Sequence, residues 1–283
     1  MNGRDLRLLA RARSLGLTLA LTVGLHCRVA LSTNSSSSTT VYFAHKDSTY
    51  LNPGQRAGGA ALVPERVGPD PLPLLVFLHG TNPNGDLHLW LGGGGRDLRP
   101  VARRLYRSKK LQSFVLAGPS QTHAAKHGRT LWQGFDLDTF VEDVARALDG
   151  KATIDRGAVV FFGHSGAGCS AQGGLASDFW SQARVFPRML VAVDPCLDAR
   201  SGAAFSRRPA GVPLWVMWQS AMWPREPAIF RQTLKKGRPE GRVDRVEALS
   251  VVGANAHDAI LPVALERAAS ELFVRRALPL DAS

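Results

Sequence analysis

The chain alternates short apolar runs with longer segments of helical periodicity. Eight of these runs are rich in β-branched and aromatic residues and have the length of strands. The predicted strands lie at 40–43, 60–63, 74–78, 113–117, 158–162, 189–193, 214–218 and 246–252. The last six are far enough apart in sequence to need crossover connections, which favours parallel pairing.

Two segments show helical periodicity. In the first, the apolar positions are Leu137, Phe140, Val141, Val144 and Leu148. With Gly150 as a stop, they predict a helix over 138–149. In the second, Pro262 fits the first turn of a helix, and the apolar stripe is Leu265, Ala268, Ala269, Leu272 and Phe273. Continuous apolar strands separated by helices predict an α/β fold, with a mostly parallel sheet covered on both faces and ligands at the carboxyl ends of the strands.

The first forty residues differ from the rest. A basic region with Arg4, Arg7, Arg11 and Arg13 precedes an apolar stretch over 15–25. This is the pattern of a secretory signal and is short for a membrane span, although an uncleaved anchor is the alternative. The Ser/Thr-rich stretch that follows has no apolar period. We therefore expect a signal peptide over 1–32, a linker over 33–40, one folded domain over 41–283, and a secreted or periplasmic protein.

Positive charge exceeds negative charge, with a formal net charge of +12 over 283 residues. Removing residues 1–32 deletes five Arg and one Asp and leaves +8. The one dense basic run is Arg103, Arg104, Arg107, Lys109 and Lys110. We interpret it as a solvated helix face, because no nucleic-acid-binding motif accompanies it. We therefore expect no nucleic-acid partner, and association with an anionic surface remains open.

The segment 158–168 carries the strongest chemical signal. A buried strand leads into Gly163-His164-Ser165-Gly166-Ala167. Small residues around a serine allow a sharp strand-to-helix turn that exposes its hydroxyl. A helix starting there aims free N–H groups at developing negative charge. The pattern predicts that Ser165 is a nucleophile.

A second segment predicts an oxyanion hole. The strand at 74–78 ends in His79-Gly80-Thr81, and the loop after this strand can contribute a backbone N–H to the site. Thr81 and Gly166 are the predicted donors. We expect His79 to hydrogen-bond the loop rather than to take part in catalysis.

The base and the acid should follow the serine in sequence. His257 is the only histidine beyond Ser165, and we expect it in a loop over 253–258. Asp194 directly follows the strand at 189–193, whereas the strand at 214–218 is followed by no carboxylate until Glu226. We predict that Asp194 orients the histidine and stabilises its imidazolium. Glu226 and Asp198 remain alternatives.

These motifs, in this order, resemble the α/β-hydrolase superfamily over roughly residues 41–276. Gly163-His164-Ser165-Gly166 with Asp194-Pro195 is similar to the chlorophyllase and polyester-hydrolase branch. The segment 153–156 is similar to polyhydroxybutyrate depolymerases and feruloyl esterases. The resemblance implies an α/β-hydrolase fold with an eight-stranded sheet, catalysis by Ser, His and Asp through an acyl-enzyme, and no metal or organic cofactor. Ala167 in place of Gly departs from the common pattern.

Three functions fit these features. The first is hydrolysis of a small-molecule or polymer ester, and the second is cleavage of amides or peptides by the same triad. The third is a non-catalytic protein of the same fold that binds an anionic envelope surface. Cys169 and Cys196 would lie near the nucleophile and the acid, so in an oxidising compartment they could pair or stay free.

Overall fold

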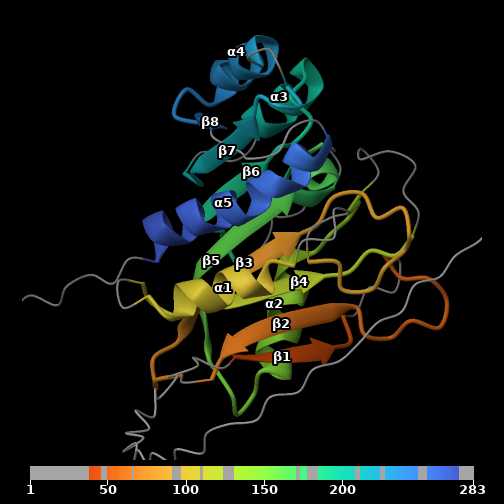
Figure 1. The fold of residues 1–283 in the computed structure, drawn as a ribbon, viewed down its shortest axis with the longest axis vertical. Coiled ribbons are helices and arrows are strands. Elements are labelled where there is room, and N and C mark those ends of the chain that lie inside the picture. Colours follow the sequence, from red (N-terminus) through yellow and green to blue (C-terminus); the bar gives the residue numbers. More distant parts are fainter. Residues whose placement is uncertain are drawn as a thin grey trace, which may run out of the picture. The chain divides into compact units, whose positions relative to one another are not determined.

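A single sheet of eight strands forms the centre of the domain (Figure 1). The computed structural model describes residues 38–45, 50–65, 67–90, 97–108, 111–123, 131–169, 173–176, 184–207, 211–223, 227–247 and 254–273. The strands are β1 (Ser38–Phe43), β2 (Gly59–Pro64), β3 (Leu72–Leu78), β4 (Val115–Pro119), β5 (Ile154–His164), β6 (Met189–Val193), β7 (Leu214–Gln219) and β8 (Arg242–Val246).

The sheet is mostly parallel, as the sequence predicts. The spatial order is β1-β2-β4-β3-β5-β6-β7-β8. β1 and β2 pair antiparallel with their neighbours, and β4, β3, β5, β6, β7 and β8 pair parallel. The carboxyl ends of six strands therefore meet at one edge, which is where a parallel sheet presents its site.

Helices cover both faces of the sheet (Figure 1). They are α1 (Arg99–Tyr106), α2 (Leu137–Ala147), α3 (Ala199–Ser206), α4 (Ala228–Gly237) and α5 (Ala254–Leu272). α1 and α5 pack with Leu75 and Phe77 on one face, and α2, α3 and α4 pack with Leu74 and Val76 on the other. Every residue of β3 is buried, which is why this strand is continuously apolar rather than alternating.

Most of the strand predicted at 246–252 lies outside the described residues. The last strand among the described residues is β8, which pairs parallel with β7 and covers Arg242–Val246, so it begins before the predicted range. β8 is an edge strand with the sequence Arg-Val-Asp-Arg-Val, so it contains no apolar run to detect. Its Arg242 guanidinium lies 3.9 Å from the ring centre of Trp215 on β7, a cation–π contact that joins the two strands through their side chains.

The terminal helix begins earlier than Pro262 suggests. Pro262 lies inside α5 rather than in its first turn. An interior proline costs about 3 kcal/mol. Ile260 and Leu261 are fully buried against the sheet, and each contributes about 1.5–3 kcal/mol through burial, which offsets that cost.

The helix predicted over 138–149 is confirmed as α2, where Asp136 accepts a hydrogen bond from the Thr139 N–H at the amino end.

The amino end of the domain also begins earlier than predicted. β1 starts at Ser38, so it includes the last three residues of the stretch predicted as a linker. Thr39 and Thr40 are β-branched and pair with Val63 and Leu62 of β2, which explains how this polar segment forms a strand. The predicted signal peptide lies outside the described residues. Among the described helices, none combines the length and the apolar character needed to cross a bilayer.

Candidate active site

Ser165 lies in a sharp turn at the carboxyl end of β5. β5 ends at His164, Ser165 has a φ of 52°, and a short 3-10 helix, η3, covers Ser165–Gly168. A left-handed φ is uncommon for a serine and is often found at functional sites. A Cβ at Gly163 would lie 2.0 Å from the Leu175 side chain, so the turn depends on a missing side chain there.

The loop after β3 packs directly against this serine. A Cβ added to Gly80 would lie 2.7 Å from the Ser165 Cβ and 3.2 Å from its Oγ. Thr81, one predicted oxyanion donor, is the next residue in that loop. Gly166, the other, is buried and directly follows Ser165. The two segments predicted to supply the donors therefore meet at the serine.

His79 holds this loop in place, as the sequence predicts. Its Nε2 accepts a hydrogen bond from the Gln121 N–H at 2.9 Å, so its Nδ1 carries the proton and donates to the Gly80 carbonyl at 2.8 Å. The Trp132 indole N–H donates to the His79 carbonyl at 2.8 Å. Burial lowers the pKa of His79 to about 4, because the charged form would lose its hydration. His79 is therefore neutral near pH 7 and serves the loop structurally.

His257 and Asp194 are brought together. The His257 Nδ1 donates to the Asp194 Oδ2 at 2.8 Å. A carboxylate can only accept, so the Nδ1 carries the proton and the Nε2 is left as the basic nitrogen. The predicted loop position of His257 is wrong, because this residue lies in the first turn of α5. The helix forms here because its apolar face packs onto the sheet on either side of the histidine. The buried residues of this face are Ala256, Ala259 and Ile260.

His164 links this pair to the serine turn. Its Nε2 donates to the His257 carbonyl at 2.8 Å, and the two rings lie 4.5 Å apart between centres. His164 immediately precedes Ser165 and is fully buried. The first turn of α5 is therefore attached to the residue next to the nucleophile candidate.

Asp194 occupies a second sharp turn, at the carboxyl end of β6. Its φ is 46°, and its side chain is fully buried. Its backbone N–H donates to the Met217 carbonyl at 2.7 Å. Gln219 donates to both carboxylate oxygens, from its backbone N–H to Oδ1 at 3.3 Å and from its Nε2 to Oδ2 at 2.7 Å. These bonds satisfy a buried charge that would otherwise be costly.

Gln219 is a site residue that the sequence reasoning missed. Its Oε1 accepts from the Met222 N–H at 2.8 Å, which turns the Nε2 toward Asp194. The available signal was its place at the end of β7, the strand beside β6. Gln219 carries an amide rather than a carboxylate, so it does not match the residue type expected for the acid.

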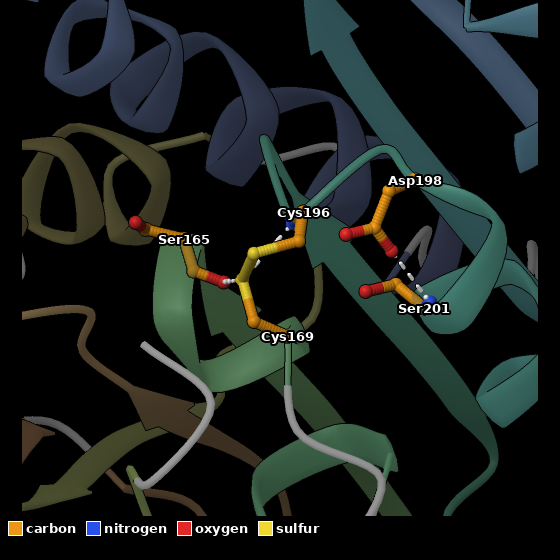
Figure 2. Close-up of a disulfide and its surroundings, with 5 residues drawn as sticks. All are labelled: Ser165, Cys169, Cys196, Asp198 and Ser201. Atoms are coloured by element: carbon orange, nitrogen blue, oxygen red, sulfur yellow. Dashed lines mark hydrogen bonds between the residues drawn. A yellow bond between two sulfur atoms is a disulfide. The ribbon is translucent and has the colours of Figure 1, made fainter. Parts of the chain in front are cut away.

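The alternative acids have other positions. The Asp198 Oδ1 accepts from the Ser201 N–H at 2.8 Å, so Asp198 caps the amino end of α3 (Figure 2). Glu226 lies outside the described residues. Within the described ranges, no group of three His, Cys, Asp or Glu side chains could hold a metal ion.

Cys169 and Cys196 form a disulfide, the outcome that the sequence left open. Their Cα atoms are 4.9 Å apart, and 27 residues separate them in sequence. Figure 2 shows the bridge between the helical turn after Ser165 and the loop after β6. The bridge therefore joins the segment that carries the serine to the segment that carries Asp194.

Comparison with known proteins identifies the fold. Neither a protein-family model nor a curated protein matches this sequence. A solved ferulic acid esterase is 15% identical with a TM-score of 0.55, over 84% of this chain and 97% of that one. An S-formylglutathione hydrolase from Agrobacterium tumefaciens is 14% identical with a TM-score of 0.53, over 84% of this chain and 96% of that one. A ferulic acid esterase from Anaeromyces mucronatus is 13% identical with a TM-score of 0.53, over 84% of this chain and 90% of that one. The chain therefore has the α/β-hydrolase fold.

Proposed function

We propose that this protein is a serine hydrolase that cleaves carboxylic esters through an acyl-enzyme. Ser165 is the nucleophile, His257 the general base and Asp194 the acid that orients it. The observation that carries the proposal is the hydrogen bond between His257 and Asp194, joined through His164 to the left-handed turn at Ser165. That the similar solved structures include ferulic acid esterases supports an ester over an amide substrate.

The mechanism follows from the protonation states. The Nε2 of neutral His257 takes the proton of the Ser165 hydroxyl as Oγ attacks the ester carbonyl. The Asp194 carboxylate stabilises the imidazolium that forms, and the backbone N–H groups of Thr81 and Gly166 hold the oxyanion. Collapse of this intermediate expels the alcohol, which receives the proton from His257. Water activated by the same histidine then hydrolyses the acyl-enzyme.

We also propose that the protein works outside the cytosol, in a secreted or periplasmic setting. The disulfide supports this location, because disulfides persist in oxidising compartments. The leader pattern over 1–32 is consistent with the same route.

The test is the substitution Ser165→Ala. We expect hydrolysis of a p-nitrophenyl acyl ester to fall to the background rate and labelling by a fluorophosphonate to disappear, with the circular dichroism spectrum unchanged. Ser206→Ala, at the end of α3, is the matched control and should keep both activities. Undiminished turnover by the Ser165→Ala variant would refute the assignment. Matched acyl ester and acyl anilide substrates would rank ester against amide cleavage.

A further inference from the structure

Two left-handed residues lie at the ends of adjacent strands. Ser165 follows β5 and Asp194 follows β6, with φ values of 52° and 46°. Cys169 comes four residues after the serine, and Cys196 two residues after the aspartate. The disulfide thus closes a bridge between two turns that each hold an unfavourable backbone conformation.

We propose that the Cys169–Cys196 disulfide is a positioning cross-link of the active site. It holds the turn that carries Asp194 against the turn that carries Ser165, so that Asp194 stays aligned with His257. The proposal rests on the proposed function, since it assigns these two cysteines to the same site.

The contacts around the bridge are with the backbone of both turns. The Cys169 Sγ lies 3.2 Å from the Ser165 carbonyl oxygen, and the Cys196 N–H donates to this Sγ at 3.0 Å (Figure 2). A Cβ added to Gly168 would lie 2.7 Å from the Pro195 Cβ, so the segment after Ser165 and the loop after β6 approach as closely as a glycine allows. Cys169 is 3% exposed, and Cys196 is half-buried. The bridge is therefore packed into the site's base rather than attached at its surface.

Asp194 is held by hydrogen bonds from both of its neighbouring strands, but by a covalent link on one side alone. On the β7 side, its N–H donates to the Met217 carbonyl and Gln219 donates to its carboxylate, and β7 and β5 lie on opposite sides of β6. On the β5 side, Val193 pairs with His164, and His257, which is bonded to His164, donates to Oδ2. The disulfide is a covalent restraint from the β5 side, where the nucleophile lies. Without it, noncovalent contacts alone hold the loop after β6 against the serine turn, and the loop can shift within them. Since a misplacement of about 1 Å can reduce a rate about a hundredfold, a small movement is enough to matter.

The experiment is reduction of the intact, folded protein with dithiothreitol. The S–S bond breaks as the reagent supplies two electrons and two protons, two protein thiols form, and the reagent closes to its cyclic disulfide. Intact mass and a thiol count establish that both cysteines have been freed. Burst titration with the p-nitrophenyl ester counts working sites, so that kcat is expressed per site. Circular dichroism follows the fold.

We expect kcat per site to fall about tenfold, with KM changed less than twofold and the spectrum retained. Removal of the reductant and reoxidation should restore kcat. The double variant Cys169→Ala/Cys196→Ala should match the reduced protein and be insensitive to dithiothreitol. Val144→Ala, in the buried face of α2, is the stability control: it should lower Tm and leave kcat per site unchanged.

An unchanged kcat in protein shown to carry both freed thiols would overturn the proposal. Loss of the circular dichroism spectrum on reduction would also overturn it, because the bridge would then be needed for the fold of the whole domain. A failure of the proposed function is distinguishable from both. In that case the oxidised protein itself neither turns over the ester nor reacts with a fluorophosphonate.

Discussion

The turn after β5 and the turn after β6 each contain a residue with left-handed φ, but they are stabilised differently. Both place a side chain at the carboxyl edge of the sheet from a residue with left-handed φ. The serine turn depends on missing side chains, at Gly163 within it and at Gly80 in the loop beside it. The aspartate turn depends on added bonds, from Gln219 and from the disulfide. The serine turn thus depends mainly on small residues, whereas the aspartate turn depends mainly on hydrogen bonds from a neighbouring strand, and the disulfide joins the two.

The physical reason lies in the two side chains. In the proposed function the Ser165 hydroxyl must be open to a substrate, so its turn needs space around it. The Asp194 carboxylate is buried and charged, and an unpaired buried charge costs several kcal/mol. Its turn is therefore stable only where donors converge on it. The two turns should respond to different kinds of substitution.

The largest effect is expected for Asp194→Asn. The amide keeps the size but removes the charge that, in the proposed mechanism, stabilises the His257 imidazolium. Its NH2 group can also donate to Nδ1, which favours the tautomer with the proton on Nε2. We expect kcat on a p-nitrophenyl ester to fall about a thousandfold to ten thousandfold. Asp198→Asn makes the same change at the cap of α3, where Asn caps nearly as well, so its kcat should stay near that of the wild type. The opposite ranking would transfer the role of the acid to Asp198.

A second substitution breaks the serine turn from outside. Gly80→Ala places a methyl group 2.7 Å from the Ser165 Cβ. Neither carbon can move without its own backbone, so the loop or the serine must shift. We expect kcat to fall about a hundredfold, with a smaller change in KM. Gly68→Ala is the control, because a Cβ there meets nothing within 4 Å. Equal kinetics for the two variants would show that the loop after β3 does not shape the site.

The smallest of the three effects tests the aspartate turn. Gln219→Met keeps the side-chain length and removes the Nε2 donor to Asp194, while the backbone N–H still reaches Oδ1. We expect kcat to fall about tenfold, the scale seen when a residue that orients a catalytic group is lost. Exposed Gln112→Met controls for the chemical change and should leave kcat unaltered. A wild-type kcat in Gln219→Met protein would mean that the backbone bond alone orients Asp194.

Much of the fold can be predicted from the sequence, because buried parallel strands have continuous apolar runs. For this reason the strands β3, β5, β6 and β7 were predicted from the sequence. β8 was not, because an edge strand with charged residues lacks such a run. The start of α5 was misplaced because the proline rule is local, whereas the burial of Ile260 and Leu261 is decided by the sheet.

The sequence alone determined the α/β character, the turn at Ser165 and the presence of histidine and aspartate in a suitable order. Local physics is sufficient for these, since strand periodicity and the small residues around a serine act within a few positions. Only the tertiary structure decided that Asp194 meets His257, that Gln219 donates to both of its oxygens, and that Cys169 joins Cys196. These contacts join residues 25 to 63 positions apart in sequence. Whether such residues meet depends on which strands become neighbours in the sheet and on their register.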